Sequence, residues 1–167
     1  GANVLPPVIE LLLELVLDDG AFLLDDQYFL EPLGEKANAV AFTELLQLHA
    51  DRITAFNGWD TLTFHGLAAG AQGSVWGATN VIPELSRQLW DALAVDGDLV
   101  RGRELWAKIY PICRLLEQYD YAAAVKTGMQ LRGYATGPVR KPSTLLEGEA
   151  RAEFARLLRA AGVEVVD

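Results

Sequence analysis

Apolar positions recur at intervals of three and four along the C-terminal half of the chain, which is the spacing of one helix face. Gly97-Asp98 interrupts this pattern and would end one helix and cap the next, and Gly162 ends the pattern. We therefore expect Val81–Ala161 to be almost wholly helical. The apolar positions are Leu85, Leu89, Leu93 and Trp90 before the interruption, and Leu99, Gly102, Trp106, Ile109, Cys113 and Leu116 after it.

An earlier helix is expected from Asn38, a fair N-cap, with Val40, Leu45 and Leu48 on one broad face and Phe42 beside them. Near the other end of the chain, Thr144 and Glu147 have the spacing of a capping box, which predicts the start of a last helix there.

Between these helices the pattern changes to short β-prone runs separated by glycines. Ile53–Phe56 ends at Asn57-Gly58, and Ser74–Trp76 lies between two glycines. A small-residue helix that ends at Gly70 separates the two runs, and Pro83 suits the first turn of the next helix. This order predicts two short parallel strands joined by a helix, within Arg52–Asn80. Function in such folds lies at the carboxyl ends of the strands, here around Gly77 to Asn80.

The N-terminal segment is less regular. Gly1–Pro7 is predicted to be extended, Val8–Leu17 to be a deeply packed helix, and Ala21–Leu30 to contain two short strands. Glu10 and Glu14 lie four residues apart on one face of the helix. Packing is favoured over acid–base chemistry for this pair because nothing nearby supplies a cleft.

Several of these segments resemble, in order, the late strands and helices of one family. RITAFNGWD at residues 52–60, the stretch from Gly66 to Glu84, and AAVKTGMQLRG followed by VRKP within Tyr121–Pro142 resemble the dihydrodipicolinate synthase and N-acetylneuraminate lyase family. The likeness runs from roughly Asn38 to Gly162. It implies a (β/α)8 barrel that forms a Schiff base with pyruvate or another 2-oxo acid, and we expect no cofactor.

A whole barrel of this kind needs about 250 residues, and the chain has 167. The predicted fold class is therefore α/β, a partial (β/α)8 TIM-barrel-like unit with a helix-rich C-terminal half. We expect a single domain over residues 1–167. Within it, residues 1–37 form a divergent or truncated segment, residues 38–80 the barrel βα units, and residues 81–167 the C-terminal helices.

Three residues are candidates for the site. Lys36 follows Gly34 at the spacing of the family's Gly-x-Lys strand, whose lysine is the Schiff-base nucleophile. The family binds the substrate carboxylate through the backbone glycine that Gly58 resembles, and Val75 would line the pocket. Each has an ordinary alternative: Lys36, beside Glu35 and Pro32, suits a solvated loop, and Gly58 suits a strand-to-helix turn.

The composition limits the classes of partner that we expect for this chain. With 14 basic and 23 acidic residues the net charge is −9, which argues against nucleic acid and an anionic membrane as partners. The single Cys113 excludes an internal disulfide and fits a reducing cytoplasm. His65 has no ligand-like neighbours at metal spacing, so no metal is expected. With no basic leader and no apolar run of about 20 residues, the prediction is a soluble, cytoplasmic protein.

Three functions remain open. The first is an active dihydrodipicolinate synthase-like lyase or aldolase that uses Lys36 and is completed by oligomerisation. The second is an incomplete member with lost or impaired catalysis, and the third is a small-molecule binding module without covalent chemistry. A partial barrel exposes apolar groups and strand edges, so we expect a homo-oligomer. Lys36 separates the alternatives, and its setting favours the second.

Overall fold

The computed structural model describes residues 35–51 and 54–166, so the predictions for the first 34 residues lie outside the described part of the chain. The chain divides into two compact units, residues 1–75 and 76–167, which are described separately below. The single-domain prediction is not tested by this division and stays a prediction.

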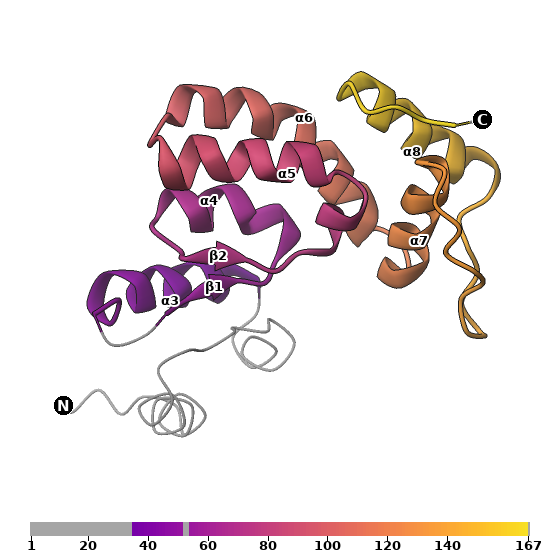
Figure 1. The fold of residues 1–167 in the computed structure, drawn as a ribbon. Helices are drawn as coiled ribbons and strands as arrows, with labels where there is room; N and C mark the ends of the chain where they lie inside the picture. The colour runs from indigo at the N-terminus through magenta and orange to yellow at the C-terminus, as the bar shows by residue number, and fades with distance from the viewer. Residues whose placement is uncertain (1–34, 52–53, 167) are drawn as a thin grey trace. The chain divides into compact units, whose positions relative to one another are not determined.

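The first unit contains the predicted parallel strands (Figure 1). After helix α3 (Glu35–Leu48) come strand β1 (Phe56–Asn57), helix α4 (Thr63–Ala68) and strand β2 (Gly73–Ser74). β1 and β2 pair in parallel, and α4 packs against both strands. The prediction of two short parallel strands joined by a helix is confirmed, although each strand shares only one residue, Phe56 or Ser74, with its predicted run.

The core of the first unit is small. Leu46, Ala55 and Ala71 are buried together, with Phe42 and Ala69 packed against them. Our prediction for the face of α3 was wrong, because Val40 is 68% exposed and Leu48 63% exposed. Phe42 and Leu46, four residues apart, make the contact instead. The helix also begins at Glu35 and not at Asn38.

The second unit is helical. It contains α5 (Pro83–Trp90), a π-helical turn (Asp91–Val95), α6 (Leu99–Glu117), α7 (Tyr121–Leu131) and α8 (Gly148–Ala160). α6 packs against α5, α7 and α8, and Figure 1 shows α5 and α6 side by side. The fully buried side chains of this unit include Ile82, Leu89, Ile109, Ile112, Cys113, Leu116, Phe154 and Leu158.

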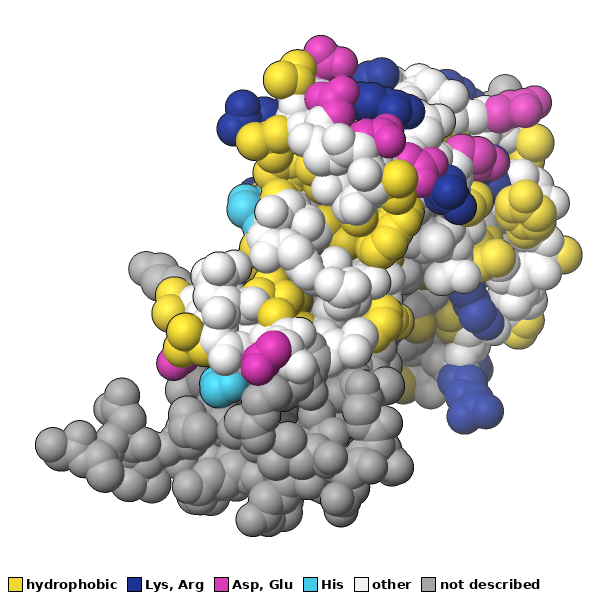
Figure 2. All heavy atoms as spheres, turned by 60° about the vertical axis from the view of Figure 1, so that its left-hand side comes forward, with side chains coloured by type: hydrophobic (Ala, Val, Ile, Leu, Met, Phe, Trp, Pro, Cys, Tyr) yellow, Lys and Arg dark blue, Asp and Glu magenta, His cyan; other side chains and the backbone are white. Residues whose placement is uncertain are grey.

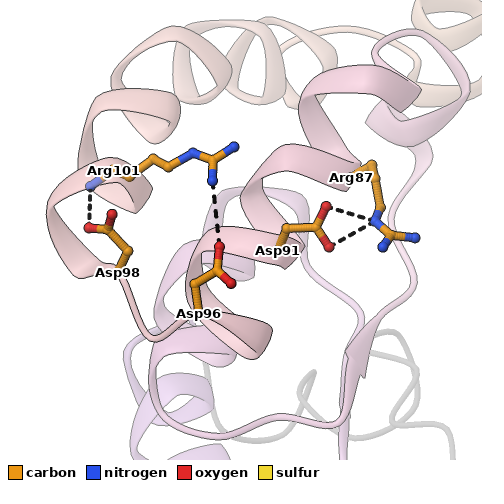
Figure 3. Close-up of polar contacts among 5 residues, drawn as sticks. All are labelled: Arg87, Asp91, Asp96, Asp98 and Arg101. Carbon is orange, nitrogen blue, oxygen red and sulfur yellow. Dashed lines mark hydrogen bonds and ion pairs between the residues drawn. The ribbon is translucent and has the colours of Figure 1, made fainter.

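The connection into α6 follows the sequence prediction. Gly97 has a positive φ of 65°, and Asp98 Oδ1 accepts a hydrogen bond from the Arg101 backbone N–H at 2.9 Å, so Asp98 caps the helix (Figure 3). Arg101 also forms an ion pair with Asp96 at 3.5 Å. Leu99, expected within the buried seam, is 40% exposed, because it lies at the first residue of the helix beside this charged turn.

The prediction of an almost wholly helical region fails for residues 132–147, which form an irregular segment. Gly133 and Gly137 both have positive φ, and Pro138 and Pro142 lack the N–H that a helix needs. The capping-box prediction is also wrong: Glu147 is the N-cap of α8, and no side-chain cap bond forms there.

The described surface mixes charges of both signs. Figure 2 shows acidic and basic side chains interspersed, with apolar side chains between them, on the face it presents. Several charged side chains of the described residues form ion pairs, such as Arg87 with Asp91 at 2.8 Å (Figure 3). In the described part of the chain, no helix is both long and apolar enough to cross a membrane.

Candidate functional site

The carboxyl ends of β1 and β2 bring two predicted site residues together. Asn57 pairs with Ser74 in the parallel register, so Gly58 and Val75, the next residues along each strand, lie beside each other at the same edge. The backbone N–H of Val75 donates to the carbonyl of Asn57 at 2.8 Å, which continues the pairing to this edge. The structure thus places Gly58 and Val75 where a parallel α/β fold presents its functional groups.

The two faces of this strand pair differ in character. Gly73 lies under the ring of Phe56, whose carbons occupy the space that a Cβ at Gly73 would need. Side chains alternate along a strand, so Val75, two residues on, projects to the same side as that vacant position. The side chain of Val75 is 52% exposed. This face therefore offers an apolar lining made by Phe56 and Val75.

The opposite face, toward α4, carries a buried polar cluster. Asn57 Nδ2 donates to Ser74 Oγ at 2.8 Å and to Thr63 Oγ1 at 3.1 Å, and the two hydroxyl oxygens are 3.1 Å apart. Asn57 and Thr63 are almost fully buried. The cluster satisfies polar groups that would otherwise be costly to bury between a strand and a helix.

This cluster also reaches the turn that contains Gly58. Asn57 Nδ2 donates to the carbonyl of Trp59 at 2.8 Å. The same carbonyl accepts the backbone N–H of Leu62 at 3.0 Å, which begins the short 3₁₀ turn Asp60–Leu62. Gly58 therefore lies between two anchored points, the strand pairing at Asn57 and the fixed carbonyl of Trp59.

Lys36, the predicted nucleophile, lies in the first turn of α3. Its backbone is therefore helical, whereas the resemblance places this lysine in a strand. Gly58 and Val75 are brought together at the strand ends, and Lys36 belongs to the helix that precedes β1. The catalytic role of Lys36 stays a prediction, as do the binding roles of Gly58 and Val75.

The short 3₁₀ turn Gly77–Asn80, near the start of the second unit, is held by other residues of that unit. The Gly77 backbone N–H donates to the hydroxyl oxygen of Tyr121 at 2.8 Å, and Asn80 Nδ2 donates to the Gly77 carbonyl at 3.1 Å. The Tyr121 hydroxyl occupies the position that a Cβ at Gly77 would take, so a side chain there would displace it. The backbone N–H and the carbonyl of Gly77 are thus both hydrogen-bonded to side chains.

Sequence reasoning missed Asn57, Thr63 and Ser74 as one cluster, and it missed Tyr121. Asn57 and Ser74 are 17 residues apart, and only the strand pairing brings them together. A signal was present in the sequence: each is a polar residue at the end or start of a short β-prone run. In the described residues, no group of three or more His, Cys, Asp or Glu side chains could hold a metal ion.

A parallel β–α–β unit followed by a helical C-terminal region places the architecture in the α/β class. Residues 35–161 match the sequence profile of the dihydrodipicolinate synthetase family. The chain belongs to this family.

Three relatives illustrate the match. The 4-hydroxy-tetrahydrodipicolinate synthase of Thermomicrobium roseum is 36% identical over 118 residues, which are 71% of this chain and 38% of that protein. Dihydrodipicolinate synthase from Aquifex aeolicus has a similar fold, with a TM-score of 0.78 at 21% identity over 95% of this chain and 52% of that one. For the Acinetobacter baumannii enzyme, solved in complex with pyruvate, the TM-score is 0.68 at 21% identity, covering 75% and 43%.

The covered shares show how much of each relative this chain represents. The chain spans about two fifths to a half of the length of these relatives. The fold prediction, a partial barrel unit with a helix-rich C-terminal half, is confirmed by the structural likeness and by the family match.

Proposed function

We propose that this chain is an incomplete member of the Schiff-base 2-oxo-acid lyase and aldolase family, able to receive a 2-oxo acid such as pyruvate but impaired in catalysis. One observation carries the proposal: Gly58 and Val75 lie together at the carboxyl ends of paired strands, whereas Lys36 lies in a helix. The candidate binding residues and the candidate nucleophile thus lie in different kinds of secondary structure.

The strand ends suit the carboxylate of a 2-oxo acid. Glycine has no side chain, so a ligand can approach its backbone closely, and backbone N–H groups form strong hydrogen bonds with a charged carboxylate. Phe56 and Val75 supply an apolar lining for the remaining carbons of a small substrate such as pyruvate. The pyruvate complex of the Acinetobacter relative supports this choice of substrate.

Catalysis in this family type requires a free amine. The nitrogen attacks the carbonyl carbon of the 2-oxo acid, and the resulting carbinolamine loses water to give an iminium. An exposed lysine has a pKa near ~10.4, so under about one part in a thousand is free amine at pH 7. An active lysine therefore needs a dry site or a neighbouring cation that lowers its pKa.

The position of Lys36 supports impairment. The carboxyl ends of parallel strands converge on one edge of a sheet, and a lysine at such an end would share that edge with Gly58 and Val75. A lysine in the first turn of α3 does not belong to that edge by topology. The proposal is therefore that binding at the strand ends persists and that Schiff-base formation is lost or slow.

The test combines binding and trapping on the full chain. Pyruvate should shift the amide resonances of Gly58 and Val75 in a saturable way, whereas treatment with pyruvate and borohydride should give no adduct on Lys36 by peptide mass mapping. Lys36→Ala should leave the result unchanged, as should the matched control Lys108→Ala. Absence of saturable shifts at the strand ends would refute the binding part.

The alternative function has an equally clear signature. If Lys36 is the nucleophile of an active enzyme completed by oligomerisation, borohydride should fix one adduct on Lys36 that disappears in Lys36→Ala and persists in Lys108→Ala. Light scattering on the same sample should then show an assembly larger than one chain. That pair of results would replace impaired catalysis by the active lyase.

A further inference from the structure

We propose that Asn57 is a positioning residue that fixes the Gly58 turn in its binding conformation, an inference that rests on the proposed function for its consequence in pyruvate binding. Asn57 holds the turn from both sides. Its backbone carbonyl accepts the N–H of Val75 at 2.8 Å, and its side-chain Nδ2 donates to the carbonyl of Trp59 at 2.8 Å. One buried residue thus joins the strand end at Val75 to the far side of Gly58.

Gly58 needs such an anchor because it is a glycine. Glycine populates more backbone conformations than any other residue and loses the most freedom when one of them is fixed. Gly58 lies outside β1, which ends at Asn57, and before the 3₁₀ turn, which begins at Asp60. The contact between Asn57 Nδ2 and the Trp59 carbonyl spans this gap and restricts the dihedral angles of Gly58.

Two hydroxyl groups also surround the side-chain amide of Asn57. Ser74 Oγ accepts from Asn57 Nδ2 at 2.8 Å and Thr63 Oγ1 at 3.1 Å, and Asn57 Cβ packs close to Gly66 of α4. Asn57 is 5% exposed, so water does not compete effectively for its amide.

The three acceptors of the Asn57 side-chain amide differ in chemistry. Two variants can therefore distinguish a positioning role from general packing. The hydroxyl groups of Ser74 and Thr63 can donate as well as accept, so they can reverse direction and bond to a carboxylate. The Trp59 carbonyl can only accept. Asn57→Asp therefore keeps the partners on the hydroxyl side and removes the bond to Trp59, while Ser74→Ala removes one hydroxyl and keeps the bond to Trp59.

The experiment compares these two variants with the unmodified 167-residue chain by ¹⁵N relaxation. We expect the order parameters of the Gly58 and Trp59 amides to be close to ~0.85 in the unmodified chain and in Ser74→Ala, and to fall toward ~0.6 in Asn57→Asp. A residue that only stabilised the fold would lower the melting temperature and leave these order parameters unchanged in the folded state.

Pyruvate titration gives the functional readout. When the Gly58 turn is mobile in the free chain, binding must fix it, and fixing the backbone of one residue weakens binding by about tenfold. The dissociation constant should therefore rise by about that factor in Asn57→Asp and change little in Ser74→Ala. Equal order parameters in both variants, or equal losses of affinity, would overturn the inference.

Two further outcomes are decisive. If Asn57→Asp does not fold, Asn57→Ser takes its place, because its short hydroxyl does not reach the Trp59 carbonyl from the same backbone position. If the unmodified chain shows no saturable pyruvate shifts, the proposed function fails, whereas the order parameters of Gly58 and Trp59 still decide whether Asn57 fixes the turn.

Discussion

Arg132 offers the sharpest test of how the second unit is held together. It is the C-cap residue of α7, and its side chain is 12% exposed. The guanidinium reaches the start of α5, where Nη1 donates to the Val81 carbonyl at 2.8 Å and Nη2 to Glu84 Oε1 at 2.9 Å. Val81 is fully buried, whereas the Glu84 side chain is 59% exposed. The two bonds should therefore differ in energy.

The magnitudes follow from that difference. Arg132→Met keeps the apolar stem but leaves the buried Val81 carbonyl without its donor, which costs about 1–3 kcal/mol. Loss of the exposed ion pair adds at most about 1 kcal/mol. We expect a total loss of about 2–3 kcal/mol for Arg132→Met and less than about 1 kcal/mol for Glu84→Gln.

Thermal and urea unfolding, followed by far-ultraviolet circular dichroism, measure both losses, because the helices of residues 76–167 dominate that signal. The melting temperature should fall by roughly 4–12 °C for Arg132→Met, at about 2–4 °C per kcal/mol. Raising the salt concentration should reduce only the contribution of Glu84. Equal losses for the two variants would show that the ion pair, and not the buried carbonyl, carries the stabilisation.

Two further predictions concern α7. Gly128→Ala places a Cβ 2.7 Å from Phe154 Cζ and 2.8 Å from Val81 Cγ1, so overpacking should exceed the gain in helix propensity and cost about 1–2 kcal/mol. An unchanged melting temperature would refute this. Hydrogen bonds from Ser143 and from the Ala123 N–H lower the pKa of Asp120. This stabilisation is lost as pH falls through the lowered pKa, and Ser143→Ala should raise that pKa in a carboxyl NMR titration.

The sequence predicted the points where the chain changes direction. Gly70, Gly97 and Gly162 all have positive φ at or after helix ends, and Asp98 caps α6. These features depend on the conformational preference of one residue and its immediate neighbours, so local pattern is sufficient to find them.

The irregular segment after α7 could not be found in the same way. It is held by contacts with α7: Lys126 Nζ donates to the Pro138 carbonyl at 2.9 Å, and the Leu146 N–H donates to Thr127 Oγ1 at 3.0 Å. These partners lie 12 and 19 residues apart in the chain. Thr144 and Glu147 satisfied a local rule for a helix start, but α8 begins at Gly148 without a side-chain cap bond.

The candidate site, too, could be predicted from the sequence only in part. The order of strand, helix and strand was readable from sequence, and parallel pairing then places Gly58 beside Val75. The cluster beneath them was not readable, because the bonds of Asn57 to Thr63 and Ser74 depend on strand register and on how α4 packs. The prediction for the face of α3 was wrong for the same reason, since it is Phe42 and Leu46 that make the tertiary contacts.

The two halves of the proposed chemistry place different demands on a chain that spans about half of its relatives. A carboxylate site made of backbone groups needs only two adjacent strand ends, and residues 56–75 supply these from one β–α–β unit. A lysine nucleophile needs a dry enclosure that lowers its pKa, which depends on surrounding elements of a whole barrel. Binding is therefore a local property and Schiff-base formation a collective one. The proposal that this partial barrel retains the first without the second rests on this physical separation.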